Sequence, residues 1–425
     1  MRKKFFVAIA LPFFLLGCNK DETKYVYNET PPSEEPVVLK ERKDIQLTRA
    51  EQEFVQENNG FALELFKKVS GLANGGSTVI SPLSVTIDFG MVNNGASGET
   101  RDEINKVLGY KEGSVEALNS FCQSILKQSS EVDPSTTIGI GNAAVVNKSR
   151  VALNDGFTKT IQSAYGAEVI YKEFGKDDVM GLINSWCDKN TNGMIPKILD
   201  QQPSASEYAN FLNAVYFKGN WSNKFESPRS EDFTLEDGNR IKVKMMWKEG
   251  AFGCADIPGI GRYLQVPYGN QAYKMIFLLP EADKTIGEVK DSLNREIWSS
   301  MVKAIAPADV DVKIPVFETE TGVLHLKEAL MEMGIKKAFV SGEADFSGMT
   351  KDAITISDVL HKARIKVDEK GTEAAAVTVI KGDTSAGGPS APPQPRVFHA
   401  DRPFIYAITE VSTGAIFFIG QYTGK

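Results

Sequence analysis

The chain has 425 residues, a formal net charge of −7 and an isoelectric point near 5.4. An acidic protein lacks the positive field that nucleic acids require, so we expect no nucleic-acid partner. Four cysteines and three histidines are too few and too widely spaced to form a disulfide framework or a zinc site. We therefore expect no metal and no cofactor, and free thiols at Cys122, Cys187 and Cys254.

The first 18 residues have the pattern of an export signal. Three basic residues precede the apolar run Phe5–Leu16, which is too short to span a bilayer. The segment Leu15–Cys18 resembles the lipobox of bacterial lipoproteins, which implies that Cys18 is lipidated and anchors the mature chain to a membrane. The alternative is a plain signal peptide in which Cys18 merely follows the apolar run.

Residues 19–48 are polar and proline-containing, a composition that cannot bury a core, so we expect a flexible tether. Its first residues, Asn19–Glu22, resemble the charged surface-export signal of some Gram-negative lipoproteins. This resemblance implies an outer-membrane lipoprotein exposed at the cell surface. A periplasmic or secreted protein is the alternative.

Residues 49–425 contain no proline-rich or charged break and no repeat, which favours one large domain. Helix and strand patterns alternate without regular βαβ order, which indicates an α+β fold. The expected elements are a helix over Glu51–Ser70, a strand ending at Ile80 that leads into a helix near Pro82, a strand over Ile138–Asn147, a helix over Phe157–Tyr165, strands over Tyr208–Phe217 and Tyr273–Leu279, a helix over Leu324–Met333, and a strand over Ala415–Gln421.

The stretch 367–398 has two halves of different character. From Thr372 to Thr384 every even-numbered residue is uncharged, whereas the charged residues in that span are odd-numbered. Since successive strand residues point to opposite faces, this arm has one face that can be buried and one that tolerates water. The second half contains four prolines, which cannot donate to a sheet, and predicts an extended return. An ordinary surface loop after an edge strand is the alternative interpretation.

Within this stretch, Glu369–Thr378 (EKGTEAAAVT) resembles the hinge of the reactive-centre loop of inhibitory serpins. The segment Ala400–Ile408 (ADRPFIYAI) resembles the segment that follows that loop, and three further blocks resemble serpin signatures: Asn213–Trp221, Leu326–Phe339 and Ile356–Lys362. The resemblance implies a serpin fold over residues 49–425, with mixed and antiparallel sheets, surrounding helices and an exposed reactive-centre loop at residues 369–398.

The resemblance also implies roles for individual residues. The hinge would comprise Glu369, Gly371, Thr372, Glu373, Ala374, Ala375 and Ala376. The polar "shutter", where the central strands part, would comprise Ser81, Ser84, Asn213 and His361. Trp221 would lie in the "breach", where the loop first enters the sheet.

The cleaved bond is expected between Ser385 and Ala386. Serpins are cut at a characteristic distance after the hinge glycine, and from Gly371 this distance points to Ser385. Insertion must also finish before Pro389, and Thr384 is the alternative cleaved residue. Small residues at these positions suit elastase-like or subtilisin-like serine proteases, and papain-like cysteine proteases are a further class of target.

The function implied by the resemblance is inhibition of serine endopeptidases. A protease would cut the loop and form an acyl-enzyme, and the arm would insert into the central sheet before the ester hydrolyses. The uncharged hinge residues favour this over a non-inhibitory serpin that acts as a binding or carrier protein at the cell surface. We expect a monomer whose partner is the target protease. The sequence contains no hydrolase motif around His325, His361 or His399, so we expect it not to be an enzyme.

Overall fold

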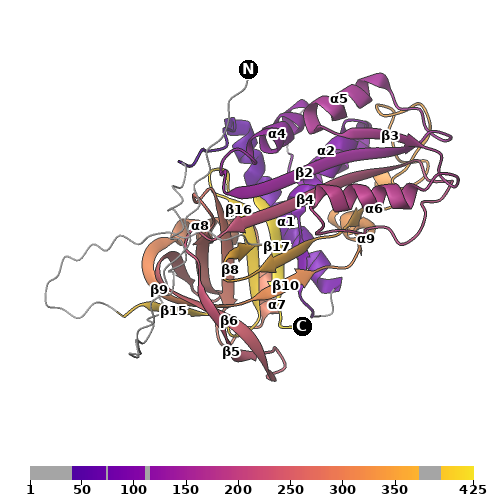
Figure 1. Cartoon of the computed structure of the whole chain (residues 1–425). Coiled ribbons are helices and arrows are strands. Elements are labelled where there is room, and N and C mark those ends of the chain that lie inside the picture. Colours follow the sequence, from indigo (N-terminus) through magenta and orange to yellow (C-terminus); the bar gives the residue numbers. More distant parts are fainter. Residues whose placement is uncertain (1–40, 73–74, 111–114, 373–393) are drawn as a thin grey trace, which may run out of the picture. The chain divides into compact units, whose positions relative to one another are not determined.

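The apolar runs expected from the sequence form two large sheets in the computed structural model, which describes residues 41–72, 75–110, 115–372 and 394–425 (Figure 1). All of these residues belong to the unit Pro36–Lys425. Elements are labelled as in Figure 1, and the bounds below refer to this described part of the chain.

A six-stranded sheet, in the order β10-β13-β14-β4-β2-β3, positions the hinge. Its strands are β10 Phe317–Glu320, β13 Arg364–Val367, β14 Gly371–Thr372, β4 Ala209–Asn220, β2 Thr136–Asn147 and β3 Glu168–Lys172. Strands β2 and β4 pair antiparallel along almost their whole length. On its other edge, β4 is paired only with the two residues of β14. Among the described strands, the edge of β4 over residues 209–218 therefore has no partner on that side.

The second sheet has the order β1-β17-β16-β8-β7-β6-β9-β15, with β5 also paired to β6. Its strands are β1 Thr78–Ile80, β17 Ile416–Tyr422, β16 Phe404–Glu410, β8 Tyr273–Pro280, β7 Gly261–Pro267, β6 Arg240–Ile257, β9 Ala306–Pro315, β15 Arg396–His399 and β5 Glu226–Thr234. Its edge strand β15 resumes the chain after the loop and pairs in parallel with β9.

The described helices are α1 Arg49–Leu72, α2 Pro82–Asn93, α3 Gly98–Leu108, α4 Val115–Gln128, α5 Asp155–Tyr165, α6 Val179–Asn190, α7 Ile286–Ser292, α8 Arg295–Ala304 and α9 Lys327–Met333, followed by a 3₁₀ turn at Lys337–Phe339. Helices pack against both large sheets (Figure 1), with α2 and α6 on opposite faces of the six-stranded sheet and with α7 and α8 against the other sheet.

The two faces of β4 pack against different helices, because its side chains alternate. Val215 and Phe217 belong to the main hydrophobic core together with residues of α2. Leu212 and Ala214 pack instead with α6 in a second, smaller core. Odd-numbered residues of β4 thus face α2, and even-numbered ones face α6.

Most expected elements form, with boundaries shifted by a few residues. Helix α2 begins with Pro82 in its first turn, and the Ser81 side chain caps it by accepting a hydrogen bond from the Ser84 N–H. The helix expected over Leu324–Met333 is wrong at its start, since it begins at Lys327. Leu324–His325 forms β11, which pairs with β12, Leu360–His361. Cross-strand pairing satisfies these backbone groups and outweighs the apolar pattern of the segment.

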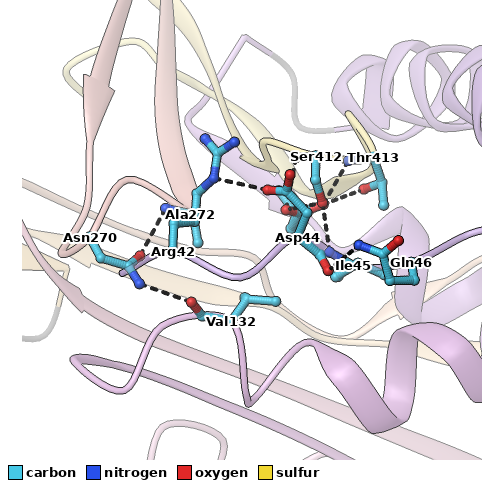
Figure 2. Close-up of polar contacts among 10 residues, drawn as sticks. Arg42, Asp44, Ile45, Gln46, Val132, Asn270, Ala272, Ser412 and Thr413 are labelled. Carbon is cyan, nitrogen blue, oxygen red and sulfur yellow. Dashed lines mark hydrogen bonds and ion pairs between the residues drawn. The ribbon is translucent and has the colours of Figure 1, made fainter. Parts of the chain in front are cut away.

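The predicted tether ends earlier than residue 48, because residues 41–48 pack on the folded unit (Figure 2). Ile45 is only 5% exposed, and its N–H donates to Ser412 Oγ at 2.9 Å. The Gln46 N–H donates to Gln128 Oε1 at 2.8 Å, and the Lys43 N–H donates to the Val132 carbonyl. We call Glu41–Thr48 the N-terminal strap.

Two further observations concern the described residues. Cys122, Cys187 and Cys254 are buried free thiols, as predicted. No helix in the described ranges has the length and apolar character needed to cross a bilayer.

Candidate functional site

The hinge enters the six-stranded sheet through a tight turn between β13 and β14. Residues 368–370 reverse the chain, and the Asp368 carboxylate accepts hydrogen bonds from the N–H groups of Lys370 (2.9 Å) and Gly371 (3.2 Å). Thr372 then lies between two strands, opposite Val367 on β13 and Gly219 on β4. Glu369 is half-buried, and its carbonyl accepts a hydrogen bond from the Phe225 N–H.

Gly371 is required by the close approach of two backbones. Its φ is +157°, and a Cβ at this position would lie 2.1 Å from the Gly219 carbonyl oxygen. Any side chain would therefore push β14 away from β4. The hinge glycine is what allows the arm to join β4 at all.

The residue after this glycine is buried close to Trp221, the expected breach residue. Thr372 is 1% exposed, and its Oγ1 lies 2.6 Å from the Tyr268 hydroxyl. The Tyr268 ring stacks on Trp221 at 4.4 Å between centroids, and the Trp221 indole N–H donates to the Asp368 carbonyl at 2.9 Å. Burial raises the pKa of Tyr268 far above its usual value, so the phenol keeps its proton and can donate to Thr372.

Three of the four expected shutter residues lie together at the N-terminus of α2. His361 Nε2 accepts a hydrogen bond from the Ser81 N–H at 3.0 Å, and Ser81 Oγ donates to the Phe417 carbonyl at 2.8 Å. Burial lowers the pKa of His361 to about 4, so the ring is neutral at neutral pH, as its acceptor role requires. Ser84 joins through its N–H, which donates to Ser81 Oγ.

The fourth, Asn213, makes its contact elsewhere. Its amide Nδ2 donates to Asn142 Oδ1 at 2.6 Å, and Asn142 Nδ2 in turn donates to the Tyr165 carbonyl. Asn142 lies directly opposite Asn213 on β2. In the uncut chain, Asn213 therefore joins β4 to β2 rather than to His361.

A cavity lies beside the unpaired edge of β4. It has a volume of about 80 Å³, enough for several water molecules. Its walls are β4 residues 209–213, residues 354–360, and side chains of α2 and α6. Because helices from opposite faces of the sheet meet in it, the cavity is a gap in the sheet itself. We call the unpaired edge of β4 over residues 209–218, together with this cavity, the slot.

Three residues of the cavity wall each have a buried polar atom without a hydrogen-bond partner. Among the described residues, Asp88 Oδ1, Asn210 Nδ2 and Asn213 Oδ1 are buried without a hydrogen-bond partner, and all three residues line the cavity. Burial raises the pKa of Asp88 to about 8, so its carboxyl keeps a proton at neutral pH. Each unsatisfied buried group costs roughly 1–3 kcal/mol.

Comparison with known proteins identifies this arrangement. A family model described as "Serpin (serine protease inhibitor)" matches residues 56–424. The chain belongs to the serpin family. Serpins are protease inhibitors rather than catalysts and bind target proteases, which agrees at the family level with the expected absence of enzyme activity.

Relatives and solved structures cover nearly the whole serpin domain. Iripin-8 of Ixodes ricinus is 32% identical over 378 residues, which span 86% of this chain and 92% of Iripin-8. Leukocyte elastase inhibitor of Xenopus laevis is 31% identical over 376 residues, spanning 85% and 97% respectively. The crystal structure of the thermophilic serpin tengpin in the native state has a TM-score of 0.78 and 29% identity, covering 91% of this chain and 96% of tengpin. The predicted α+β serpin fold is confirmed.

The described residues that flank the expected reactive-centre loop belong to two different sheets. The N-terminal flank is β14 in the six-stranded sheet, and the C-terminal flank is β15 at the edge of the other. Arg262 donates to the Val397 carbonyl of β15, and His399 Nε2 lies 2.8 Å from Asp311 Oδ2 on β9. Uncut, the loop is therefore held at both ends.

Several expected site residues lie outside the described residues. These are the remaining hinge residues Glu373, Ala374, Ala375 and Ala376, the reactive-bond residues Thr384, Ser385 and Ala386, and the lipidation residue Cys18. Their roles stay predictions.

Sequence reasoning missed residues that the structure places in the site. Asp88 could have been noticed, because it is the single charged residue of the largely apolar helix α2. Tyr268 and Asn142 carry no such signal, since only the tertiary fold brings them to Thr372 and Asn213.

Two of the histidines contact carboxylates that the sequence did not indicate as partners. His399 contacts Asp311, and His325 Nδ1 lies 2.5 Å from Asp358 Oδ2. In the part of the chain that the structure describes, neither histidine has a serine or cysteine partner, so neither pair forms a hydrolase triad.

Proposed function

We propose that this serpin inhibits serine endopeptidases by a suicide-substrate trap. The observation that carries the proposal is the position of Thr372, which is buried and already paired with β4 at the head of an unpaired edge. An arm that already has one residue in the sheet can continue to pair along the unpaired edge of β4. Cleavage of the loop would free the arm from β15 and let it continue.

In the proposed trap, the protease begins to cleave the loop as a substrate but does not complete the hydrolysis. The protease serine attacks the Ser385 carbonyl, the bond to Ala386 breaks, and the amine leaves with a proton from the protease. The resulting ester links the protease to the end of the arm. About 14 residues at roughly 3.3 Å each then carry that ester on the order of 45 Å along β4.

The driving force comes from new strand pairing. At a net gain of about 1 kcal/mol per hydrogen bond, a full strand contributes on the order of 10 kcal/mol. This is comparable to the stability of a whole domain. Such a gain is sufficient to distort the attached protease and stop ester hydrolysis.

The small residues Thr384, Ser385 and Ala386 favour elastase-like or subtilisin-like targets, with papain-like cysteine proteases as a further class. Two matched relatives support this choice only by name, both being called leukocyte elastase inhibitor. Trypsin-like proteases require Lys or Arg at the cut, and the nearest such residues, Lys381 and Arg396, lie away from it.

We also propose that lipidation at Cys18 holds the inhibitor on the outer membrane, exposed at the cell surface. The lipobox-like segment and the polar residues after it support this location. Labelling of intact cells with radioactive palmitate, followed by surface proteolysis, tests it. A Cys18→Ser variant that keeps both the label and its membrane location would contradict it.

The trap is tested by mixing the chain from Pro36 onward with an elastase-like protease and analysing the products on denaturing gels and by mass spectrometry. Starting at Pro36 keeps the N-terminal strap intact. We expect a complex that survives denaturant, with its ester at residues 384–386. Clean cleavage without a complex, repeated with subtilisin-like and papain-like proteases, would instead favour a non-inhibitory carrier.

A further inference from the structure

A sheet face outside the slot carries two of the large apolar side chains that are exposed among the described residues. Trp247 on β6 is 40% exposed, and Val397 on β15 is 47% exposed. Strand β9 lies between them, with Lys313 directly opposite Trp247 and Asp311 directly opposite Val397. Since alternate residues of a strand share a face, all four side chains point to the same side of the sheet. We call the surface that these four residues define the β6–β9–β15 face.

The indole ring of Trp247 is held in place on this face. Its N–H donates to Asp311 Oδ1 at 2.6 Å, and the other oxygen of that carboxylate, Oδ2, lies 2.8 Å from His399 Nε2. One carboxylate thus joins the ring to both β9 and β15. A fixed aromatic side chain loses little conformational entropy when a partner covers it, which suits Trp247 to anchor an interface.

A shallow hollow beside Trp247 is acidic. Its walls carry the carboxylates of Glu226, Glu249 and Asp309 against one lysine, Lys248. All three carboxylate residues are exposed. A cationic side chain is attracted both to an aromatic ring and to carboxylates, so the hollow fits a lysine or an arginine of a partner.

The position of β15 indicates which partner would reach this face. The described chain resumes at Gln394 after the expected loop, three residues before Val397. A protease that holds the loop is therefore tethered beside the face, and tethering lets a weak second contact contribute to binding. Charge selects among such proteases, because acidic residues attract a cationic rim and speed its approach.

We propose that the β6–β9–β15 face and its hollow form a second docking surface for the target protease, with Trp247 as the anchor and Glu249 and Asp309 selecting a cationic rim. This inference rests on the proposed trap, since the occupant is the protease that the loop captures. It concerns the encounter before cleavage, and it adds a determinant of which protease is captured.

The test uses two proteases that both cut after small residues: an elastase-like enzyme with a net positive charge and a subtilisin-like enzyme with a net negative charge. For each, we would measure the second-order rate constant of inhibition and the moles of full chain consumed per mole of protease trapped. We expect Trp247→Ala, and separately Glu249→Gln combined with Asp309→Asn, to lower the rate constant for the cationic enzyme about tenfold. The consumed ratio and the rate constant for the anionic enzyme should stay unchanged.

Matched controls change the same chemistry elsewhere on the surface. Tyr171→Ala removes an aromatic side chain that is 47% exposed on β3, and Asp283→Asn removes an exposed carboxylate. Neither should alter either rate constant. Equal rate constants for Trp247→Ala, the double variant and the unmodified chain would overturn the inference while leaving the trap intact.

A binding measurement separates docking from trapping. If the unmodified chain forms no covalent complex, the trap itself fails. Docking is then measured as the Kd of the uncut chain for the cationic protease whose nucleophilic serine has been replaced by alanine. We expect Trp247→Ala to raise this Kd about tenfold, and a Kd that the variants leave unchanged would overturn the inference.

Discussion

The side-chain oxygens of Thr372 and Tyr268 lie 2.6 Å apart in the protein interior, and this contact ties the hinge to the turn between β7 and β8. The same tyrosine stacks on Trp221, the residue that follows β4. The first residue of the arm is therefore held inside the sheet before any cut. In the proposed trap, insertion would only have to propagate from this point, without nucleating a new strand pairing.

Replacing Thr372 by arginine is expected to convert the inhibitor into a substrate. A charge at a position that is 1% exposed would be buried without a partner, and this opposes insertion. Gels should show cleaved chain in place of the covalent complex. Thr372→Ser, which keeps the hydroxyl near Tyr268, is the control and should still trap. Full trapping by the arginine variant would rule out insertion through this position.

Gly371→Ala is expected to weaken the junction of β14 with β4. The added Cβ would lie 2.1 Å from the Gly219 oxygen, so one strand must move. We expect a loss of about 2 kcal/mol in the free energy of unfolding, within the range for overpacked sites. Gly322→Ala is a matched control, because nothing lies within 4 Å of its added Cβ. Similar urea midpoints for the two variants would contradict the close-approach argument.

The extent to which the sequence predicts this molecule depends on the distance over which each feature is encoded. Periodicity and capping place α1, α2, β2 and β4 within a few residues, because these signals act over one or two turns. The hinge glycine and Trp221 are recognisable from local motifs. The start of α9 is not, because β11 exists only when Leu360–His361 arrives from elsewhere in the chain.

The candidate site shows the same limit. The Ser81–His361 contact could be expected from a family resemblance, but the Asn213–Asn142 pair and the Tyr268–Thr372 pair depend on strand register across long separations. The cavity in the slot is not encoded in any one segment, because its walls come from separate parts of the chain, including β4, α2 and α6. Sequence supplies its lining residues without showing that they meet.

The N-terminal strap is expected to contribute to stability through Ile45. Ile45→Ala removes a buried side chain and should lower the free energy of unfolding by about 2 kcal/mol, the low end for such changes because the strap can detach. Lys43→Ala, at an exposed position of the same strap, should have no measurable effect. Urea unfolding of both variants is the measurement. Equal midpoints would show that the strap contributes no packing energy.

His361 is expected to make the fold less stable in acid. Its pKa is about 4 in the folded chain against an ordinary value of 6.5, so the unfolded chain binds more protons between these values. The stability it contributes is present above pH 6.5 and is lost as the pH falls toward 4. At 1.36 kcal/mol per pKa unit this amounts to about 3 kcal/mol. Urea unfolding of His361→Gln should lack this part of the pH dependence, and an unchanged profile would refute it.

Asp88 is expected to make the fold less stable as the pH rises, which is the opposite of the effect of His361. Its pKa is raised from 3.8 to about 8 by burial, so the folded chain binds more protons than the unfolded chain between these values. The stability linked to this proton is fully present below pH 3.8 and is lost as the pH rises to 8. At pH 7 the loss is on the order of 4 kcal/mol. Asp88→Asn cannot ionise, so we expect it to be more stable than the unmodified chain at pH 7.

The advantage of Asp88→Asn should shrink as the pH falls toward 4, where both side chains are neutral. Asp283→Asn, at an exposed position, supplies the control for a simple change of net charge. Urea midpoints at pH 4.5, 6 and 7.5 give the three profiles. A pH-independent difference between Asp88→Asn and the unmodified chain would mean that the carboxyl is already ionised in the empty slot.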